Sequence, residues 1–591
     1  MPLIVQKFGG TSVADVEKIS SAARKAVRAR QEGHQVVVVV SAMGKNTDEL
    51  IRLANEVTDN PPAREMDMLL STGEQVSVAL MAMAVTSMGY EAVSLTGAQI
   101  GIRTDSTHTK ARIHSISTDR IRKALSAGKI VIAAGFQGID EEFNITTLGR
   151  GGSDTTAVAL AAVLGAEQCQ IYTDVDGVYT TDPRILPEAR MVRQVSNVEM
   201  LELASMGAGV MHSRSIEFGK KFNVAIHVRN AAADIPGTLI VNAPESKSRA
   251  VSGAACVRDE ARVTLRGVPD EPGTSHTIFS RIASQNVPVD MIVQNVGDSG
   301  RVDVSFTVLL SDLPATLEAV QKAGEKLDAD EFTFDRKVSK VSVVGLGMAQ
   351  QTGVATRMFQ AIADAGTSIQ MITTSDIKIS ALVSREDHLK ALRAAHAAFE
   401  LHVPPPDADP NPLPPPVRPR DAVDVVERLR GMEDLTVDGI ACEENQSRVT
   451  IAQVPDVPGT AARIFAQIAD QDVFVDMIVQ SCGRDDRVTD LSFTIPQPQL
   501  ERCLAALDGL SRDFGCGSIS HAPWVSKLTV SGIGMRNHTS VAIRMFEALA
   551  SAGINLEMVN SSEVSVNIVV DGEKKDQGMN CLREAFADAR Q

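Results

Sequence analysis

The pattern of hydrophobic positions changes once along the chain, near residue 243. Before this point, continuous apolar runs such as "PLIVQKF", "QVVVVVSA" and "KIVIAAG" alternate with long stretches of helical character. Uninterrupted runs of Val and Ile are typical of strands buried on both faces, as in a largely parallel sheet between helix layers. Residues 1–243 are therefore predicted to form a three-layer α/β domain.

After residue 243 the predicted elements follow a different order. The stretch "RVTLRGVPDEPGTSHTIFSRIASQNVPVDMIVQNV" indicates strand, turn, helix and strand, and the residues that follow add a strand and a helix. The order β-α-β-β-α-β defines a ferredoxin-like unit. The stretch that begins "KVSVVGLGMAQQTGVATRMFQ" repeats this order, so two such units are expected before residue 403.

A duplication accounts for the remaining chain. The hexapeptide "VDMIVQ" stands at 289–294 and again at 475–480, and the sequences around the two copies match closely. A block of two units is therefore present twice. Between the blocks, "PPPDADPNPLPPPVRP" (404–419) holds nine prolines in sixteen residues, which is typical of a semi-rigid spacer because proline lacks an amide donor.

These patterns divide the chain into six segments. The α/β domain is followed by four ferredoxin-like units in two pairs, with the proline-rich linker between the pairs. The predicted bounds are 1–243 for the α/β domain, 244–335 and 336–402 for the first pair of units, 403–420 for the linker, and 421–522 and 523–591 for the second pair.

Composition narrows the class of protein. The chain is 44% hydrophobic and 22% charged, as in ordinary soluble proteins, and its net charge of −16 argues against nucleic acid or an anionic membrane as the main partner. No uninterrupted apolar run reaches the roughly 20 residues that span a bilayer, and the start of the chain shows no signal peptide. Seven cysteines without a CxxC pair indicate reduced thiols, so we expect a cytoplasmic protein.

Two glycine-containing loops are candidate ligand sites. "KFGGTSV" (7–13) and "TLGRGGSDTTA" (147–157) each lie between a predicted strand and a predicted helix. Such turns let a backbone approach an anion at a helix N-terminus, with Lys7 as a point charge, while Arg150 has the fork geometry that holds a carboxylate. A tight turn and a helix cap at Asp154 are the plainer interpretations, but two such loops in one α/β domain favour binding.

A third segment, "YTDVDGVYTTDPR" (172–184), gathers acidic residues. Asp174, Asp176 and Asp182 could form a metal site, although their spacing lacks the calcium-loop pattern, or they could be solvated turn residues. Near a bound nucleotide, they could also face the base, the ribose or Mg²⁺.

Taken in order, "KFGGTSV", "VVVSAMGKNTDEL", "STGEQVS", "GRGGSDTTA" and "YTDVDGVYTTDPR" resemble the aspartokinases of the amino-acid kinase family. The tandem units resemble ACT domains, which bind amino acids. The resemblance implies a three-layer amino-acid-kinase catalytic domain followed by four ACT modules. It also implies a homodimer or a higher homo-oligomer. Two departures stand out: familiar monofunctional members carry one ACT pair, and Arg229 stands where some relatives have a lysine.

The reaction implied by this resemblance is phosphoryl transfer from ATP, with Mg²⁺, to the side-chain carboxylate of L-aspartate. A carboxylate is already ionised at neutral pH, so the chemistry needs positioning and charge neutralisation rather than a general base.

By the same resemblance Lys7 and Asp154 are catalytic, with Asp154 orienting Lys7. The expected ATP-binding residues are Lys7, Phe8, Gly9, Gly10, Ser41, Thr173, Asp174, Tyr179 and Arg184. The expected aspartate-binding residues are Thr47, Glu74, Arg150, Gly151, Gly152 and Ser153. The sequence does not name ligands for the metal.

The resemblance to ACT domains also implies effector sites, with lysine and threonine as the effectors. In each block "PDxPGT" precedes a helix, and an acid lies inside the otherwise apolar hexapeptide; a solvent-facing acid at a strand start is the plainer interpretation. We expect each acid to receive an amino acid's ammonium group at a seam between the two units of one block. The expected residues are Asp270, Gly273, Val289, Asp290, Gln294, Ser375 and Asp376 in the first block, and Asp456, Gly459, Val475, Asp476, Gln480, Ser562 and Glu563 in the second.

Two alternatives remain open at this stage. One is another amino-acid kinase that acts on a different carboxylate or carbamate. The other is a non-catalytic amino-acid sensor, which the presence of Lys7, Arg150 and Asp154 argues against. "VSVVGLGMAQQ" lacks the third glycine of a dinucleotide-binding fingerprint, and no P-loop motif occurs.

Overall fold

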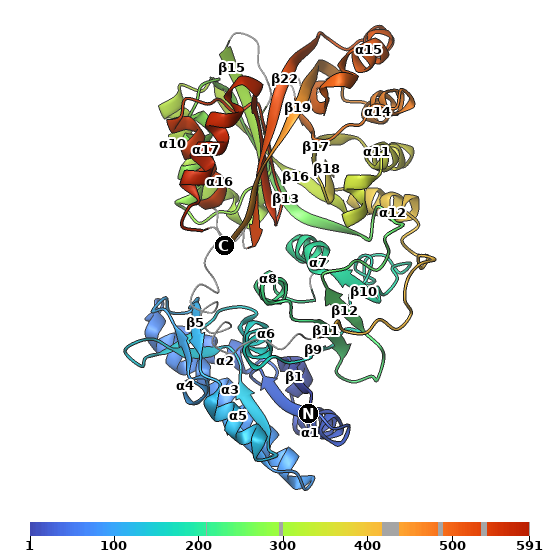
Figure 1. Cartoon of the computed structure of the whole chain (residues 1–591). Helices are drawn as coiled ribbons and strands as arrows, with labels where there is room; N and C mark the ends of the chain where they lie inside the picture. The colour runs from blue at the N-terminus through green and yellow to red at the C-terminus, as the bar shows by residue number, and fades with distance from the viewer. Residues whose placement is uncertain (209, 295–299, 417–435, 483–487, 534–539, 590–591) are drawn as a thin grey trace.

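The computed structural model describes the chain except residues 209, 295–299, 417–435, 483–487, 534–539 and 590–591. Residues 417–420 of the predicted linker and 421–435 of the predicted third unit therefore lie outside the described residues. The described part forms a lower α/β domain and an upper block of strands covered by helices (Figure 1).

The predicted three-layer α/β domain is confirmed. Its main sheet is parallel except where β11 and β12 pair, and the strands predicted from continuous apolar runs lie at its centre. The strand order is β10 (Gln194–Ser196), β12 (Thr238–Val241), β11 (Ile226–Asn230), β9 (Gln168–Thr173), β1 (Leu3–Phe8), β2 (Gln35–Val40), β6 (Ile130–Ala134) and β3 (Ala92–Leu95).

Helices cover both faces of this sheet. Side chains that alternate along β1 and β2 point to two separate cores, which is why both strands read as uninterrupted apolar runs. One core packs against α1 (Val16–Gln31) and α3 (Ala63–Ser87), and the other against α5 (Asp119–Ser126), α6 (Gly152–Leu164) and α8 (Ser213–Phe222). By length and composition α3 could cross a membrane, but Val78, Met81 and Val85 pack it on the sheet as a core helix.

A smaller sheet borders the same domain. Its strand order is β5 (Ile113–Ile116), β4 (Ile102–Thr104), β7 (Gln137–Ile139) and β8 (Ile145–Thr147). The loop that joins β4 to β5 and the loop that joins β8 to α6 lie at the same side of the domain, because the Ala111 N–H donates to the Thr147 carbonyl at 2.9 Å.

The upper block contains the four predicted ferredoxin-like units, which we call modules 1 to 4. Module 1 contains α9 (Thr274–Ala283), β14 (Asp290–Gln294), β15 (Arg301–Leu309) and α10 (Leu313–Leu327). Module 2 contains α11 (Val354–Asp364), β17 (Ile369–Ser375), β18 (Lys378–Ser384) and α12 (His388–Ala398). Module 3 contains α14 (Thr460–Asp470), β20 (Ile478–Cys482), β21 (Val488–Pro496) and α15 (Leu500–Phe514). Module 4 contains α16 (Ser540–Ser551), β23 (Met558–Ser561), β24 (Ser565–Asp571) and α17 (Lys575–Ala585).

Four long strands are each shared by two modules. β13 (Gly253–Pro269) and β16 (Glu331–Val344) run through modules 1 and 2, while β19 (Thr436–Pro455) and β22 (Ile519–Ile533) run through modules 3 and 4. Residues 253–257 precede module 1 but pair with β16 at module 2. The predicted boundaries at 335/336 and 522/523 thus fall inside strands, because a strand of 14 or 15 residues is long enough to serve two units.

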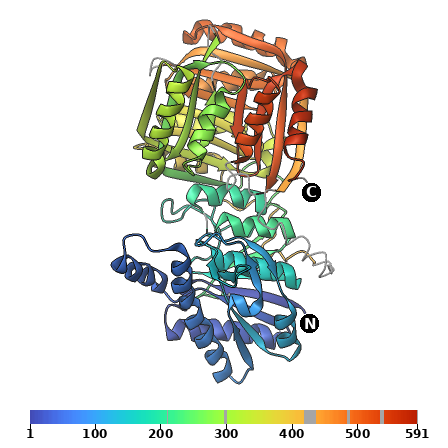
Figure 2. The ribbon, with the colours of Figure 1, turned by 90° about the vertical axis from the view of Figure 1, so that its left-hand side faces the viewer.

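Within a block the two modules share long strands, and each module also packs against a module of the other block. Strand β17 of module 2 pairs with β20 of module 3, and α11 lies against α14. Strand β14 of module 1 lies beside β23 of module 4, with α9 against α16 (Figure 2). We call these interfaces seam 2·3 and seam 1·4. Both belong to one twelve-stranded sheet, which encloses a core that includes Met291, Met371, Met477 and Met558.

Candidate active site and effector pockets

A cavity of about 1220 Å³ opens at the carboxyl ends of β1 and β2. Ligands of open α/β sheets bind at this edge. Its wall contains all of the residues predicted to be catalytic or to bind aspartate, together with Gly10 and Ser41 of the predicted ATP-binding set. The catalytic and aspartate-binding residues are Lys7, Thr47, Glu74, Arg150, Gly151, Gly152, Ser153 and Asp154. Two sequence loops more than 130 residues apart therefore meet in one cleft.

Lys7 and Asp154 form an ion pair in this cleft. The Lys7 Nζ lies 2.6 Å from Asp154 Oδ1, and the two side chains are 11% and 13% exposed. Lys7 extends from the end of β1, and Asp154 lies in the first turn of α6. The acid therefore contacts the ammonium group at the wall of the cleft.

The loop around Arg150 depends on two glycines. Gly149 and Gly151 have φ values of 76° and 72°, a left-handed conformation that glycine adopts without strain. A β-carbon on Gly151 would lie 2.3 Å from the side chain of His212. The glycines thus allow a sharp turn that presents Arg150 to the cleft, with His212 packed closely against it.

Glu74 brings a buried carboxyl group to the same cleft. It is 3% exposed, and one oxygen accepts a hydrogen bond from the Ala42 N–H at 3.0 Å. Within the described structure its other oxygen, Oε2, has no hydrogen-bond partner. Burial raises the pKa of Glu74 to about 7, against the weaker opposing effect of the hydrogen bond from Ala42.

The predicted ATP-binding residues divide into two groups. Lys7, Gly10 and Ser41 line the cleft. The other group lies outside its wall, at the last residue of the neighbouring strand β9 and after it: Thr173, Asp174, Tyr179 and Arg184. Arg184 is bound to Asp182 at 2.7 Å and Tyr179 to Asp176 at 3.5 Å. Arg229, on the adjacent β11, lies 5.8 Å from the Tyr172 ring and pairs with Asp234.

Two predicted contacts to ATP do not fit the geometry. The Gly9 N–H donates to the Tyr172 carbonyl at 3.3 Å, so this donor is already used between β1 and β9. The Phe8 side chain is 1% exposed and stacks on Tyr172 with ring centroids 4.7 Å apart. The alternation of side chains along β1 points Lys7 to the cleft and Phe8 into the core.

The cleft also contains titratable residues that the sequence did not reveal. They come from the loop between β4 and β5, from α8 and from the residue before α8, and no motif marked these segments in the sequence. They are Lys110, Arg112, His212, Arg214, Glu217 and Lys221. Burial lowers the pKa of His212, as does the neighbouring Arg214.

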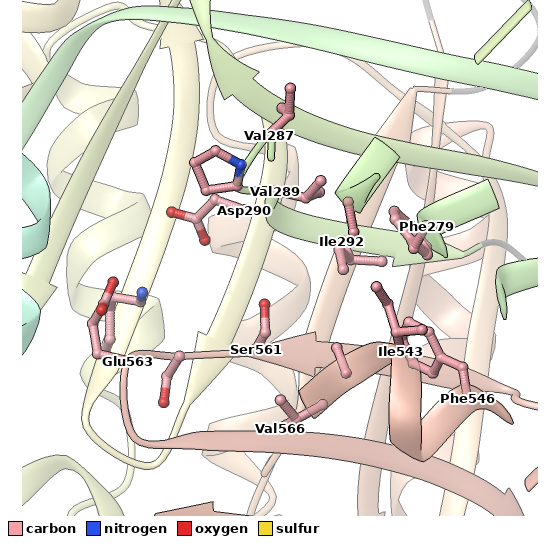
Figure 3. Close-up of a pocket in the computed structure, with 15 residues that line it drawn as sticks. Phe279, Val287, Val289, Asp290, Ile292, Ile543, Phe546, Ser561, Glu563 and Val566 are labelled. Atoms are coloured by element: carbon pink, nitrogen blue, oxygen red, sulfur yellow. The ribbon is translucent and has the colours of Figure 1, made fainter. Parts of the chain in front are cut away.

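The seams hold the predicted effector residues in unexpected combinations. The pocket at seam 1·4 brings Val289 and Asp290 of the first block to Ser562 and Glu563 of the second (Figure 3). The pocket at seam 2·3 brings Val475 and Asp476 to Ser375 and Asp376. The prediction of one site within each block is wrong, because the nested association of modules places each hexapeptide against the other block.

Buried lysines already form ion pairs with the two acids that were predicted to bind an ammonium group. Asp290 accepts from Lys340, which also lies 3.1 Å from Glu260. Asp476 lies 2.7 Å from Lys527, which also lies 2.8 Å from Glu443. Neither acid simply faces solvent, and an incoming ammonium group would have to share it with a lysine.

The "PDxPGT" turns lie elsewhere on the same seams. Asp270 accepts from the Asn555 side chain at 2.7 Å, and the Gln294 side chain donates to the Leu556 carbonyl at 3.0 Å. At seam 2·3 Ser368 donates to Asp456, and the Gln480 side chain donates to the Ile369 carbonyl. Gly273 and Gly459 approach Ala550 and Ala363 respectively. The predicted effector residues thus form two clusters on each seam rather than one.

Seam 1·4 also contacts the catalytic domain. Lys378, which lines its pocket, lies 2.9 Å from Glu202 of α7 (Asn197–Leu203). The same Glu202 accepts from the Glu563 N–H at 2.8 Å. The Lys378 side chain is 6% exposed and that of Glu202 is fully buried. A charged contact therefore joins one seam pocket to the α/β domain.

Comparison with known families agrees with the fold. Residues 2–230 match the amino acid kinase family, and residues 341–399, 450–509 and 528–586 match the ACT domain. The molecule is thus an amino-acid kinase domain joined to ACT domains.

Relatives that match over nearly their whole length narrow this class. The aspartokinase of Pseudomonas aeruginosa is 51% identical over 407 residues, which are 68% of this chain and 99% of the relative. Aspartokinase 2 of Bacillus subtilis is 49% identical, over 68% of this chain and 98% of the relative. The crystal structure of aspartate kinase from Synechocystis matches 99% of this chain and 98% of that chain, with 38% identity and a TM-score of 0.52. The chain belongs to the aspartokinase family and is an aspartate kinase.

Proposed function

We propose the following roles for the cleft residues in phosphoryl transfer from ATP to L-aspartate. Lys7 neutralises charge on the transferred phosphoryl group, and Asp154 orients Lys7. Arg150 holds the α-carboxylate of aspartate, while Thr47 and Glu74 orient the substrate. The observation that supports this best is the Lys7–Asp154 pair, which lies in the same cleft as the Arg150 loop.

Mg²⁺ would enter with ATP as part of the substrate. The described residues contain no group of three or more His, Cys, Asp or Glu that could hold a metal ion. This fits an ion held mainly by phosphate oxygens and water, which Mg²⁺ commonly prefers. Its chemistry would be to neutralise the phosphates, so that the anionic carboxylate can approach.

The seams support a second part of the proposal, feedback inhibition by lysine, threonine or both. With it we propose that the enzyme catalyses the first step of the pathway to lysine, threonine and methionine. The pocket at seam 1·4 combines apolar walls from Phe279, Ile543 and Phe546 with Asp290 and Glu563 at its polar end (Figure 3). Such a mixture suits a free amino acid, whose backbone charges and side chain need different surroundings.

Release of ADP tests the catalytic proposal. We expect release with aspartate and only background release with glutamate or without an amino acid; equal release with glutamate would contradict the substrate. Inhibition by lysine, threonine and both together should then be measured in Asp290→Ala and Asp476→Ala. In each variant, the effector concentration that gives half-maximal inhibition should rise by about 5- to 150-fold, the range of ordinary allosteric coupling. The kcat without effector should be unchanged. Unchanged inhibition curves in both variants would reject these acids as effector contacts.

A further inference from the structure

Arg214, in the first turn of α8, is a cleft residue without an assigned role. Its two terminal nitrogens donate to two different loops. Nη1 donates to the Leu148 carbonyl at 2.7 Å, and Nη2 donates to the Ala111 carbonyl at 2.9 Å. The planar fork of an arginine allows both bonds from one group, which a lysine ammonium reproduces poorly.

The two carbonyls lie at the base of the cleft loops. Leu148 directly precedes the Gly149–Arg150–Gly151 turn, and Ala111 lies between Lys110 and Arg112, which face the cleft. Leu148 is 1% exposed and Ala111 is fully buried, so each carbonyl needs a protein donor. Arg214 therefore fastens both loops to α8.

The turn that carries Arg150 needs such an anchor. One hydrogen bond closes the turn, from the Gly152 N–H to the Gly149 carbonyl at 3.0 Å, but glycine on both sides of Arg150 leaves many backbone conformations open to it. The Leu148 N–H donates to the Phe136 carbonyl and its carbonyl accepts from Arg214, so both backbone groups of the residue before the turn are held. His212, two residues before Arg214, packs against Gly151 from the other side.

We propose that Arg214 is a positioning residue that sets the Arg150 turn for binding the α-carboxylate of aspartate. The inference rests on the proposed role of Arg150 as the carboxylate-binding residue. Arg214 acts on the turn through the main chain of Leu148 and contributes no step of its own to phosphoryl transfer.

Steady-state kinetics of four variants test this inference. Arg150→Lys should raise the KM for aspartate, because the fork is lost, and leave the KM for ATP within about twofold. Arg214→Ala should raise the KM for aspartate about tenfold or more, as expected when charge-assisted hydrogen bonds are lost, with a similarly small effect on ATP. Arg214→Lys should recover part of the loss. The double variant Arg150→Lys, Arg214→Ala should be little worse than Arg150→Lys alone, because both changes disable one contact.

A matched control separates positioning from general loss of structure. Arg190 belongs to the same domain, is 15% exposed and pairs with Glu245 at 2.7 Å, outside the cleft wall. Arg190→Ala should leave the ratio of the two KM values unchanged, even if it lowers the melting temperature.

The outcomes distinguish the two proposals. If Arg150→Lys leaves the KM for aspartate unchanged, the proposed role of Arg150 fails, and positioning through it fails as well. If Arg150→Lys acts as expected but Arg214→Ala changes both KM values equally, or the double variant multiplies the two effects, only the role of Arg214 is overturned. Should Arg214→Ala not fold, the same comparison with Arg214→Lys decides the matter.

Discussion

The catalytic cleft and the module seams use buried charges in different ways. In the cleft, Lys7 has one carboxylate beside it, and the buried Oε2 of Glu74 has no partner within the described structure. At seam 2·3, Lys527 has three carboxylates within 3.8 Å. The cleft therefore keeps a buried carboxylate oxygen available to a ligand, whereas at the seam three carboxylates depend on one buried cation. Charge changes should therefore affect catalysis in the first region and stability in the second.

The largest expected effect is on turnover in the cleft. Lys7→Ala should lower kcat about 10³-fold, because in its proposed role Lys7 neutralises charge on the transferred phosphoryl group. The melting temperature should fall less than on removal of a seam lysine, since only one carboxylate, Asp154, is left without its cation and it lines the open cleft. A coupled assay of ADP release and a thermal melt measure the two quantities. Near-normal kcat in this variant would refute the assignment of Lys7.

The opposite result is expected at the seam. Lys527→Met should lower the free energy of unfolding by roughly 3 kcal/mol, because Asp476, Glu443 and Asp376 would be left close together without a cation. The kcat without effector should stay within about twofold of the parent enzyme. Lys322→Met, at an exposed pair with Glu318, is the control and should leave the melting temperature unchanged. A stable but inactive Lys527→Met enzyme would reverse the contrast drawn between the two regions.

The pH dependence of this seam has a definite sign. The pKa of Lys527 is raised above its usual value by Asp476 and Glu443, which outweigh the opposing effect of burial. The stability that the charged lysine contributes is therefore complete below the unfolded pKa of about 10.4 and is lost as pH rises through the higher folded value. Thermal melts of the parent and of Lys527→Met should converge above this pH.

The smallest predicted effect is a pH dependence of aspartate binding. Glu74 has a pKa of about 7, and if it orients aspartate as proposed, only its ionised form would attract the substrate ammonium group. The KM for aspartate should therefore fall about tenfold between pH 6 and pH 8. Without ligand the folded-state pKa lies above the unfolded value, so the stability from Glu74 falls as pH rises from about 4.3 to about 7. Glu74→Gln should remove the change in KM, and an equal pH dependence in that variant would assign the titration to another group.

The sequence predicted the helices and strands better than it predicted which modules pack against each other. Continuous Val and Ile runs predicted β1 and β2, since burial on both faces leaves a direct trace in residue type. The duplicated hexapeptide predicted similar modules, but modules with similar surfaces can associate in more than one way. Nothing in the residues 289–294 indicates that Glu563 lies beside Asp290 while Asp376 lies beside Asp476.

The missed cleft residues show the same limit. Lys110 and Arg214 reach the cleft from a loop of the small sheet and from a helix start, and neither segment has a glycine-rich turn like those that marked Lys7 and Arg150. Their position depends on how the two sheets of the domain pack, which local periodicity does not record. Cleft residues on glycine-rich loops at the ends of strands could be predicted from the sequence. Cleft residues that reach the site only through tertiary packing could not.

The nested order of modules affects how the seams respond when the protein is diluted. Because module 1 meets module 4 and module 2 meets module 3 within one chain, both seams form in a single covalent molecule. Each half of a seam then meets its partner at an effective concentration set by the connecting chain, commonly in the millimolar range for a short flexible tether. The pockets at these seams should therefore persist at protein concentrations at which an interface between separate chains would dissociate.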